Sequence, residues 1–170
     1  ALISVSDRTG LVDFALRLHG AGIELVSSGG TASVLSGAGI PVTAVADVTG
    51  DPEMLSGRVK TLHPAIHGGI LADLGDEAHR SDLTARGIEP FGLVVVNLYP
   101  FDAVIERGVS FEAARGHIDI GGPALLRAAA KNHAAVTVVV DSDDYARVLD
   151  EIGKGGSVSD ATRYDLAVKT

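Results

Sequence analysis

Residues 1–48 alternate short apolar runs with amphipathic segments, and this alternation restricts the possible folds more than any other feature of the chain. The apolar runs predict strands at 1–6, 23–28 and 41–48. The segments between them predict helices at 9–22, with Leu11, Phe14, Ala15 and Leu18 on one face, and at 29–39. A strand–helix–strand repeat of this kind predicts an α/β fold with a parallel sheet and right-handed crossovers.

The remainder of the chain continues this pattern after an irregular segment. Residues 49–70 are polar and rich in Gly and His, and a loop of that length is usually functional or disordered. The later segments predict helices near 71–89, 110–117, 123–132, 143–153 and 159–170, and strands at 91–101 and 135–141. Pro100 is expected to help end the first of these strands, and Pro123 suits a first helical position. We therefore expect one domain over residues 1–170.

Composition excludes several classes of protein. The 170 residues carry a formal net charge of −8, which argues against a broad nucleic-acid surface, although one positive pocket for a small anion remains possible. The absence of cysteine excludes disulfides and cysteine metal sites. No apolar run is long enough to span a bilayer, and the chain enters a strand pattern directly, without a signal peptide. A cytoplasmic location is the expectation.

Polar or glycine-rich residues follow each predicted strand. The carboxyl ends of parallel strands lie at one edge of a sheet, where ligands bind in folds of this class. The stretches that would meet there are Ser4–Thr9, Ser28–Thr31, Arg58–Thr61, Asn97–Tyr99 and Asp119–Gly122. Their recurrence at the same end of successive strands predicts a binding site at that edge.

The stretch "SSGGTA" at 27–32 has the composition of a phosphate cradle. Small residues let backbone N–H groups face an anion at a helix N-terminus, and hydroxyl groups add donors. An ordinary strand-to-helix turn with Thr31 as N-cap is the alternative, and Arg8 on the neighbouring turn favours the anion site. The chain has neither the lysine of a Walker A loop here nor a G-x-G-x-x-G fingerprint.

The stretch "GRVKTLHPAIHGGI" at 57–70 gathers cations and imidazoles in an acidic protein. Arg58 and Lys60 are either solvated loop residues or ligands of an anion. His63 and His67 have the spacing of a metal pair on a helix, but Pro64 lies between them and no glutamate completes an H-E-x-x-H pattern. We expect no metal, a helix that begins at Pro64, and structural roles for both histidines.

Three further residues have plain structural interpretations beside functional ones. Tyr99 could be a core aromatic at a strand end, and Asp119 could cap a helix. Lys131 could extend along a helix end, where a cation is favourable, and Arg127 lies one turn before it.

Long ordered motifs in this chain resemble one known family. "SVSD-TGL", "SGGTA", "GRVKTLHP-IH-GIL", "VVVNLYPF" and "IDIGG-ALLRAAAKNH" are similar to the inosine-monophosphate (IMP) cyclohydrolase domain of bifunctional AICAR transformylase/IMP cyclohydrolases. The resemblance implies a three-layer α/β/α sandwich around a mostly parallel sheet, like that of methylglyoxal synthase, and a transformylase domain following residue 170. Departures from the family pattern are Arg8 for Lys, Gly68 for Ala, and Asp51 for an apolar residue.

The resemblance implies a reaction and a set of residues. The reaction is closure of 5-formamidoimidazole-4-carboxamide ribonucleotide (FAICAR) to IMP with loss of water, and it needs no external cofactor. The implied catalytic residues are Lys60, Tyr99, Asp119 and Lys131. The implied substrate-binding residues are Ser6, Asp7, Arg8, Ser28, Gly29, Gly30, Thr31, Arg58, Val59, Thr61, Asn97, Leu98, Ile120 and Gly121.

Within that set, Asp119 is hypothesised to accept the amide proton, and Lys60 to stabilise or protonate the formyl oxygen. Tyr99 and Lys131 would position and polarise the substrate, although the roles of Asp119 and Lys131 could be exchanged. Two alternatives remain open: methylglyoxal synthase, acting on dihydroxyacetone phosphate, and a non-catalytic regulatory module. The family forms dimers, so a homodimer is possible, and neither nucleic acid nor membrane is an expected partner.

Overall fold

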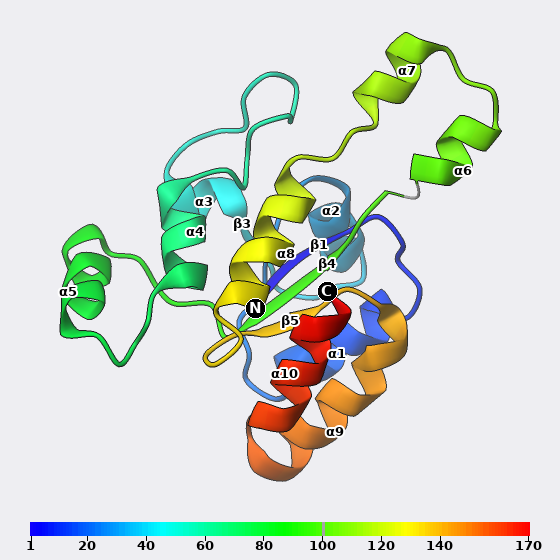
Figure 1. The fold of residues 1–170 in the computed structure, drawn as a ribbon. Coiled ribbons are helices and arrows are strands. Elements are labelled where there is room, and N and C mark those ends of the chain that lie inside the picture. Colours follow the sequence, from blue (N-terminus) through cyan, green and yellow to red (C-terminus); the bar gives the residue numbers. More distant parts are fainter. Residues whose placement is uncertain (100) are drawn as a thin grey trace.

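A computed structural model describes residues 1–99 and 101–170 and contains a five-stranded sheet flanked by helices (Figure 1). The strands are β1 (Leu2–Val5), β2 (Val26–Ser27), β3 (Thr43–Ala44), β4 (Leu93–Asn97) and β5 (Thr137–Val139). Their order in the sheet is β3-β2-β1-β4-β5, and every neighbouring pair is parallel. The predicted parallel sheet is confirmed.

Helices cover both faces of this sheet. Alternate strand residues point to opposite sides, so that Leu2 and Val94 enter one hydrophobic cluster while Ile3 and Val95 enter the other. The cluster of Ile3 includes residues of α1 (Leu11–Gly20), α2 (Gly29–Gly37) and α9 (Tyr145–Gly155). The cluster of Leu2 includes residues of α3 (Val45–Thr49), α4 (Pro64–Leu71) and α8 (Gly121–Lys131). The three-layer α/β/α sandwich is therefore confirmed.

The first helix shows how the sequence pattern determines the packing. The four residues predicted for its buried face, Leu11, Phe14, Ala15 and Leu18, are each at most 1% exposed. The Phe14 ring stacks on Tyr145 of α9 with ring centroids 4.0 Å apart. The apolar stripe of α1 thus lies between the sheet and α9.

Several predicted boundaries were wrong. The strand predicted at 41–48 is only Thr43–Ala44, because the chain turns at Val45 into α3 and buries Val45 against the sheet. Residues 49–70 are not irregular throughout, since α4 begins at Pro64, as the proline indicated. Helix α8 begins at Gly121, which makes Pro123 its third residue, a position where no intrahelical N–H partner is needed. Pro100 lies outside the described residues.

Two helical segments project from the sandwich (Figure 1). One carries the polar helix α5 (Glu77–Arg86), which matches the charged helix predicted there. The other, residues 101–118, carries α6 (Phe101–Glu106), which was not predicted, and α7 (Phe111–Gly116). Within the described residues, no helix has both the length and the apolar character needed to cross a membrane.

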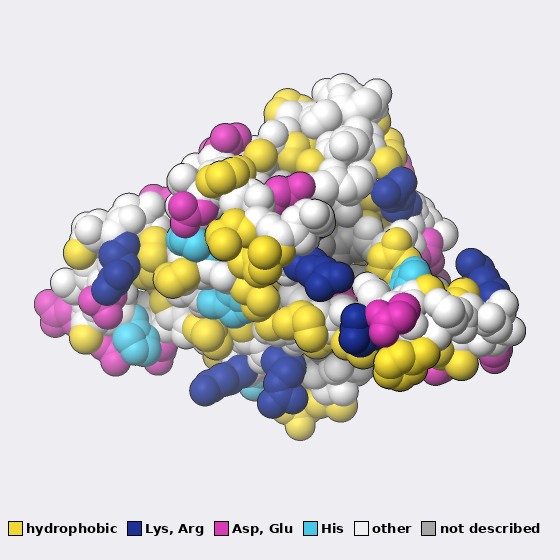
Figure 2. Space-filling view, turned by 90° about the horizontal axis from the view of Figure 1, so that it is seen from above, with side chains coloured by type: hydrophobic (Ala, Val, Ile, Leu, Met, Phe, Trp, Pro, Cys, Tyr) yellow, Lys and Arg dark blue, Asp and Glu magenta, His cyan; other side chains and the backbone are white. Residues whose placement is uncertain are grey.

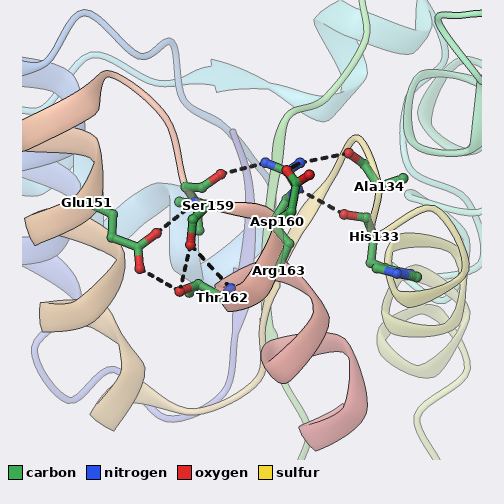
Figure 3. Close-up of polar contacts among 8 residues, drawn as sticks. His133, Ala134, Glu151, Ser159, Asp160, Thr162 and Arg163 are labelled. Carbon is green, nitrogen blue, oxygen red and sulfur yellow. Dashed lines mark hydrogen bonds and ion pairs between the residues drawn. The ribbon is translucent and has the colours of Figure 1, made fainter.

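The last helix, α10 (Asp160–Lys169), packs beside β5 and is held there by partly buried and exposed polar contacts (Figure 3). Arg163 Nε donates to the His133 carbonyl at 3.0 Å, which ties α10 to the loop after α8. Hydrogen bonds from the Thr162 hydroxyl and the Ser159 N–H hold the pKa of Glu151 on α9 below its usual value. These bonds stabilise the fold at neutral pH, and their contribution is lost as the pH falls through that lowered pKa.

Adjacent glycines in α4 provide a matched test of packing. A Cβ at Gly69 would lie 2.7 Å from the Glu89 carbonyl oxygen, whereas one at Gly68 would lie 3.7 Å from the end of Ile88. We expect Gly69→Ala to lower the free energy of unfolding by about 1–3 kcal/mol, because the new methyl group would clash with the Glu89 carbonyl and displacing that backbone costs free energy. Gly68→Ala should leave it unchanged or raise it by up to about 1 kcal/mol through helix propensity. Urea denaturation measures both, and equal effects would contradict this account of the packing.

Candidate active site

The polar stretches predicted to meet do so at the carboxyl end of the sheet. The loops after β1, β2 and β4, the segment before α4 and the start of α8 gather at this end (Figure 1). Figure 2 looks onto the molecule from that side and shows basic side chains near the middle of the face, among hydrophobic ones. Basic side chains therefore lie on this face although the whole chain carries a formal net charge of −8.

The loop after β1 is held rigidly by side chains of neighbouring elements. Asn97, the last residue of β4, accepts hydrogen bonds at Oδ1 from the N–H groups of Ser6 (2.6 Å) and Asp7 (2.9 Å). Its Nδ2 donates to the Asp7 carbonyl at 2.8 Å. The buried Thr31 hydroxyl donates to the Val5 carbonyl at 3.1 Å. The side chains of Asn97 and Thr31 therefore orient the loop that carries Arg8.

The same loop continues into a tight turn before α1. The Asp7 carboxylate accepts hydrogen bonds from the hydroxyl and the N–H of Thr9, and these bonds lower the pKa of Asp7. The Asp7 carboxylate therefore stabilises the turn. An anion at this loop would be bound by Arg8 and by backbone N–H groups, and not by the Asp7 side chain.

Two cations lie over the N-terminus of α2, where the sequence predicts a phosphate cradle. Gly29 has a φ of 55°, in the left-handed region that favours glycine. A Cβ at Gly29 would lie 3.1 Å from Lys60 Nζ, and one at Gly30 would lie 2.6 Å from Arg8 Nη2. The first N–H groups of a helix have no intrahelical partner. This end of α2 therefore combines unpaired N–H groups with Arg8 and Lys60, as an anion site requires.

Ser28, the N-cap residue of α2, adds a second indication. Its hydroxyl oxygen is buried, yet among the described residues it makes no hydrogen bond. A buried hydroxyl without a partner is costly and uncommon in folded proteins. An anion oxygen held at the start of α2 would give this hydroxyl an acceptor.

The segment directly before Lys60, residues 54–59, forms a strained turn. Met54 and Val59 exchange backbone hydrogen bonds at 2.9 and 3.3 Å. The turn between them holds Leu55 at φ 54° and Ser56 at φ 56°, and non-glycine residues there store strain that often marks functional loops. Arg58 is exposed on this turn.

The histidine that follows this segment has a structural role. His63 is the N-cap of α4, and its Nδ1 accepts from the Ala65 N–H at 3.1 Å. Its Nε2 lies 3.1 Å from a carboxylate oxygen of Asp51, the residue that departs from the family pattern. The structural role predicted for His63 is confirmed, whereas among the described residues no side-chain hydrogen bond assigns one to His67. Residues 1–99 and 101–170 contain no group of three His, Asp or Glu side chains arranged to hold a metal.

Beside the cradle, the start of α8 borders a cavity of about 320 Å³ that is open to solvent, and several of its lining side chains are exposed. Thr61, buried next to Lys60 in the chain, has its hydroxyl 3.0 Å from the position of a Cβ on Gly121. The Asp119 carboxylate accepts the Gly122 N–H at 2.9 Å, as a helix cap would. The cavity is lined by Leu98, Tyr99, Phe101, His117, Ile118, Asp119 and Pro123. Thr61 thus connects the cradle to the cavity.

Four residues that line this cavity, Phe101, His117, Ile118 and Pro123, were missed as site residues by the sequence analysis, and His117 is the titratable one among them. The His117 ring lies edge-on to the Tyr99 ring, with centroids 5.9 Å apart and planes at 73°. Its Nδ1 lies 2.7 Å from the Ala113 carbonyl oxygen. The only signal in the sequence was that His117 lies two residues before Asp119 in "GHIDIGG".

Lys131 does not join this group within one chain. It is the last residue of α8, whereas Asp119 precedes the helix, and the helix between them is about 15 Å long at 1.5 Å per residue. Lys131 is exposed and lines a separate surface hollow with Arg127, Ala130 and Thr170. The catalytic role of Lys131 stays a prediction. Within one copy of the chain, Lys131 and Asp119 lie at opposite ends of α8.

The predicted site residues therefore divide into three groups. Those with side chains or backbone at the cradle or the cavity are Arg8, Ser28, Gly29, Gly30, Lys60, Thr61, Leu98, Tyr99, Asp119 and Gly121. Those whose polar groups maintain the loops are Ser6, Asp7, Thr31, Val59 and Asn97. Arg58, Ile120 and Lys131 are exposed outside these contacts.

Comparisons with known proteins agree with this architecture. The MGS-like domain family matches residues 10–124, and the AICARFT/IMPCHase bienzyme family matches residues 129–170. A solved structure entitled "Crystal structure of ForH" superposes with a TM-score of 0.88 at 35% identity, covering 99% of this chain and 87% of that one.

Curated relatives extend the similarity to much longer proteins. The bifunctional purine biosynthesis proteins PurH of Parvibaculum lavamentivorans and Listeria welshimeri are 57% identical over 158 residues and 56% identical over 170 residues. The PurH of Rhodospirillum rubrum is 58% identical over 168 residues. These alignments cover 92%, 99% and 98% of this chain but only 29%, 33% and 32% of the relatives. The chain thus spans about a third of their length.

Proposed function

The chain belongs to the MGS-like domain family and corresponds to the N-terminal part of bifunctional PurH proteins, and from this we propose that it is an IMP cyclohydrolase domain. Its substrate would be FAICAR, and its product IMP. One observation carries the proposal: a cationic cradle at the start of α2 continues through Thr61 into a cavity that holds Tyr99 and Asp119. A ribonucleotide monophosphate joins an anionic phosphate to a heterocyclic base, which the cradle and the cavity would receive respectively.

The cradle supplies the binding energy for the phosphate. Arg8 and Lys60 offer charged donors, and the first N–H groups of α2 offer neutral ones. A guanidinium presents two donors in a planar fork, which suits a phosphate better than the lysine it replaces in the family pattern. Asn97 and Thr31 keep the Arg8 loop in place before the ligand arrives. This preorganisation lowers the ordering cost of binding.

Ring closure makes three chemical demands on the protein. The carboxamide nitrogen is a poor nucleophile, so it must lose a proton and be held in line with the formyl carbon. Negative charge then develops on the formyl oxygen and needs a donor. That oxygen must finally leave as water, which requires a second proton.

We assign these demands to residues at the cradle and the cavity. Asp119 accepts the amide proton through the carboxylate oxygen that does not cap α8, and Tyr99 orients the base from the cavity wall. Lys60, whose Nζ lies over Gly29 and whose neighbour Thr61 packs against Gly121, donates to the formyl oxygen. We assign no step to Lys131, because it lies at the far end of α8 from Asp119 in the same chain.

The decisive experiment follows the absorbance of IMP after addition of FAICAR to the purified chain. Accumulation of IMP without added metal or cofactor is the expected result. Dihydroxyacetone phosphate is offered in parallel, and its conversion to methylglyoxal would instead favour the synthase alternative. Thermal stabilisation by IMP without any turnover would favour a non-catalytic binding module.

Other properties of the longer relatives are proposals for this chain. A transformylase domain following residue 170, a homodimer and a cytoplasmic location are each consistent with the match to bifunctional PurH proteins. We treat residues 1–170 as the cyclohydrolase domain of such an enzyme.

A further inference from the structure

We propose that His117 is a proton-transfer residue of this site, which stores the proton taken from the amide and returns it to the departing hydroxyl. The inference rests on the proposed cyclohydrolase function. It is independent of the family motifs, because His117 lies outside the residues that the resemblance assigned to the site.

The position of His117 makes this role possible. It lines the same cavity as Tyr99 and Asp119, and its ring contacts the Tyr99 ring edge-on. A carbonyl oxygen can only accept, so the 2.7 Å contact with Ala113 requires the proton on Nδ1. The neutral ring then carries its lone pair on Nε2, and protonation at Nε2 leaves the bond to Ala113 intact. The imidazole can therefore gain and lose a proton without leaving its place.

The reaction needs a group of this kind. Imidazole is the side chain that most readily both accepts and donates a proton near neutral pH, whereas carboxylate, phenol and ammonium groups favour one direction. A group that must both accept and donate a proton near neutral pH works best with a pKa close to that pH. Of the residues that line the cavity, His117 is the one with an imidazole side chain.

The protons of ring closure then balance over three side chains, those of Asp119, His117 and Lys60. As the N–C bond forms, the amide proton moves to Asp119 and on to His117, while Lys60 protonates the formyl oxygen. As the C–O bond breaks, His117 gives its proton to the hydroxyl group, which leaves as water. The formamide N–H proton returns to Lys60. Each group ends in its starting state, and no oxidant or reductant is required.

The surroundings favour a reversible charge on the imidazole. The Asp119 carboxylate lines the same cavity, where a carboxylate favours a positive charge on the imidazole, and the Tyr99 ring packs edge-on to His117. On its own helix α7, Arg115 is paired with Glu112 at 2.6 Å, so that the two charges offset one another. The charged groups around His117 therefore include one unpaired carboxylate, that of Asp119, within the described contacts.

The test compares pH profiles of IMP formation for the wild type and His117→Gln, which keeps an amide donor for Ala113 but cannot titrate. The wild-type kcat should fall on the acidic side of neutrality, as expected for an imidazole that must start neutral. His117→Gln should lose this limb and at least tenfold in kcat at pH 7.5, with unchanged affinity for IMP. Free imidazole should restore part of the activity of His117→Ala. His19→Gln, on the exposed face of α1, is the matched control and should match the wild type.

The outcomes separate the two proposals. A wild-type rate with the same acidic limb in His117→Gln, or no rescue by imidazole, would overturn the role of His117. Absence of turnover in the wild type would contradict the cyclohydrolase function instead. In that case, NMR of the histidine rings still tests the placement: the His117 signal should shift on addition of IMP, and an unmoved signal would overturn it.

Discussion

Replacement of Asp119 by asparagine is expected to lower the turnover of FAICAR roughly 10²- to 10⁴-fold, the usual contribution of a general base. Asparagine has the same shape, and its Oδ1 can still accept the Gly122 N–H that Asp119 accepts at 2.9 Å. The start of α8 should therefore keep its conformation, and the affinity for IMP should change little. Initial rates of IMP formation and a binding titration with IMP measure the two effects separately.

A second aspartate provides the control for this substitution. Asp76 caps α5 by accepting the Ala78 N–H at 2.8 Å, but it lies on the projecting segment away from the cradle and the cavity. Asp76→Asn should leave turnover unchanged. If Asp119→Asn also retained near-wild-type turnover, Asp119 would be a helix cap only, which was the structural alternative for this residue.

Removal of the Lys60 side chain is expected to have the next largest effect. Lys60→Ala should lower kcat roughly 10²- to 10³-fold, because the charge on the formyl oxygen would lose its donor in the transition state. The affinity for IMP should fall less, since Arg8 and the N–H groups of α2 remain at the cradle. Steady-state kinetics with FAICAR separate kcat from KM, and calorimetry with IMP gives the affinity directly.

Arg8→Ala is the informative comparison for Lys60→Ala. Arg8 lies over Gly30 on the phosphate side of the site, so its loss should weaken IMP binding with a smaller change in kcat. Lys154, exposed on α9 and paired with Asp150, controls for loss of a lysine elsewhere. A Lys60→Ala variant that lost only affinity, at normal kcat, would place Lys60 on the phosphate and leave the formyl oxygen without its proposed donor.

Local sequence patterns predicted most of the fold. The helical spacing of Leu11, Phe14, Ala15 and Leu18 defines a stripe that is buried as expected, because a helix with one apolar face can bury it in only one orientation. Errors occur at the edge of the sheet. There the apolar run 41–48 has one neighbouring strand, and the burial of Val45 favours a helix over a longer strand.

The candidate site was predicted less completely, for a reason that particular residues illustrate. Asn97 and Thr31 were expected at the ligand, yet their side chains bind the backbone of Ser6, Asp7 and Val5. Polar residues after a strand are consistent with either role. Only the position of the partner atoms, 91 and 26 residues away along the chain, distinguishes them.

By itself, the sequence determined the order and type of the main elements, the parallel sheet, the family, and the edge at which polar loops meet. These properties depend on periodicity and on motifs that are continuous along the chain. Only the tertiary structure decided which side chains share a cavity. It brought Lys60 and Arg8 to one helix end, added His117 to Asp119 and Tyr99, and left Lys131 at the far end of α8. The physical reason is that contacts between side chains of different elements depend on how the helices and loops pack on the sheet. The spacing of residues along the chain does not specify that packing.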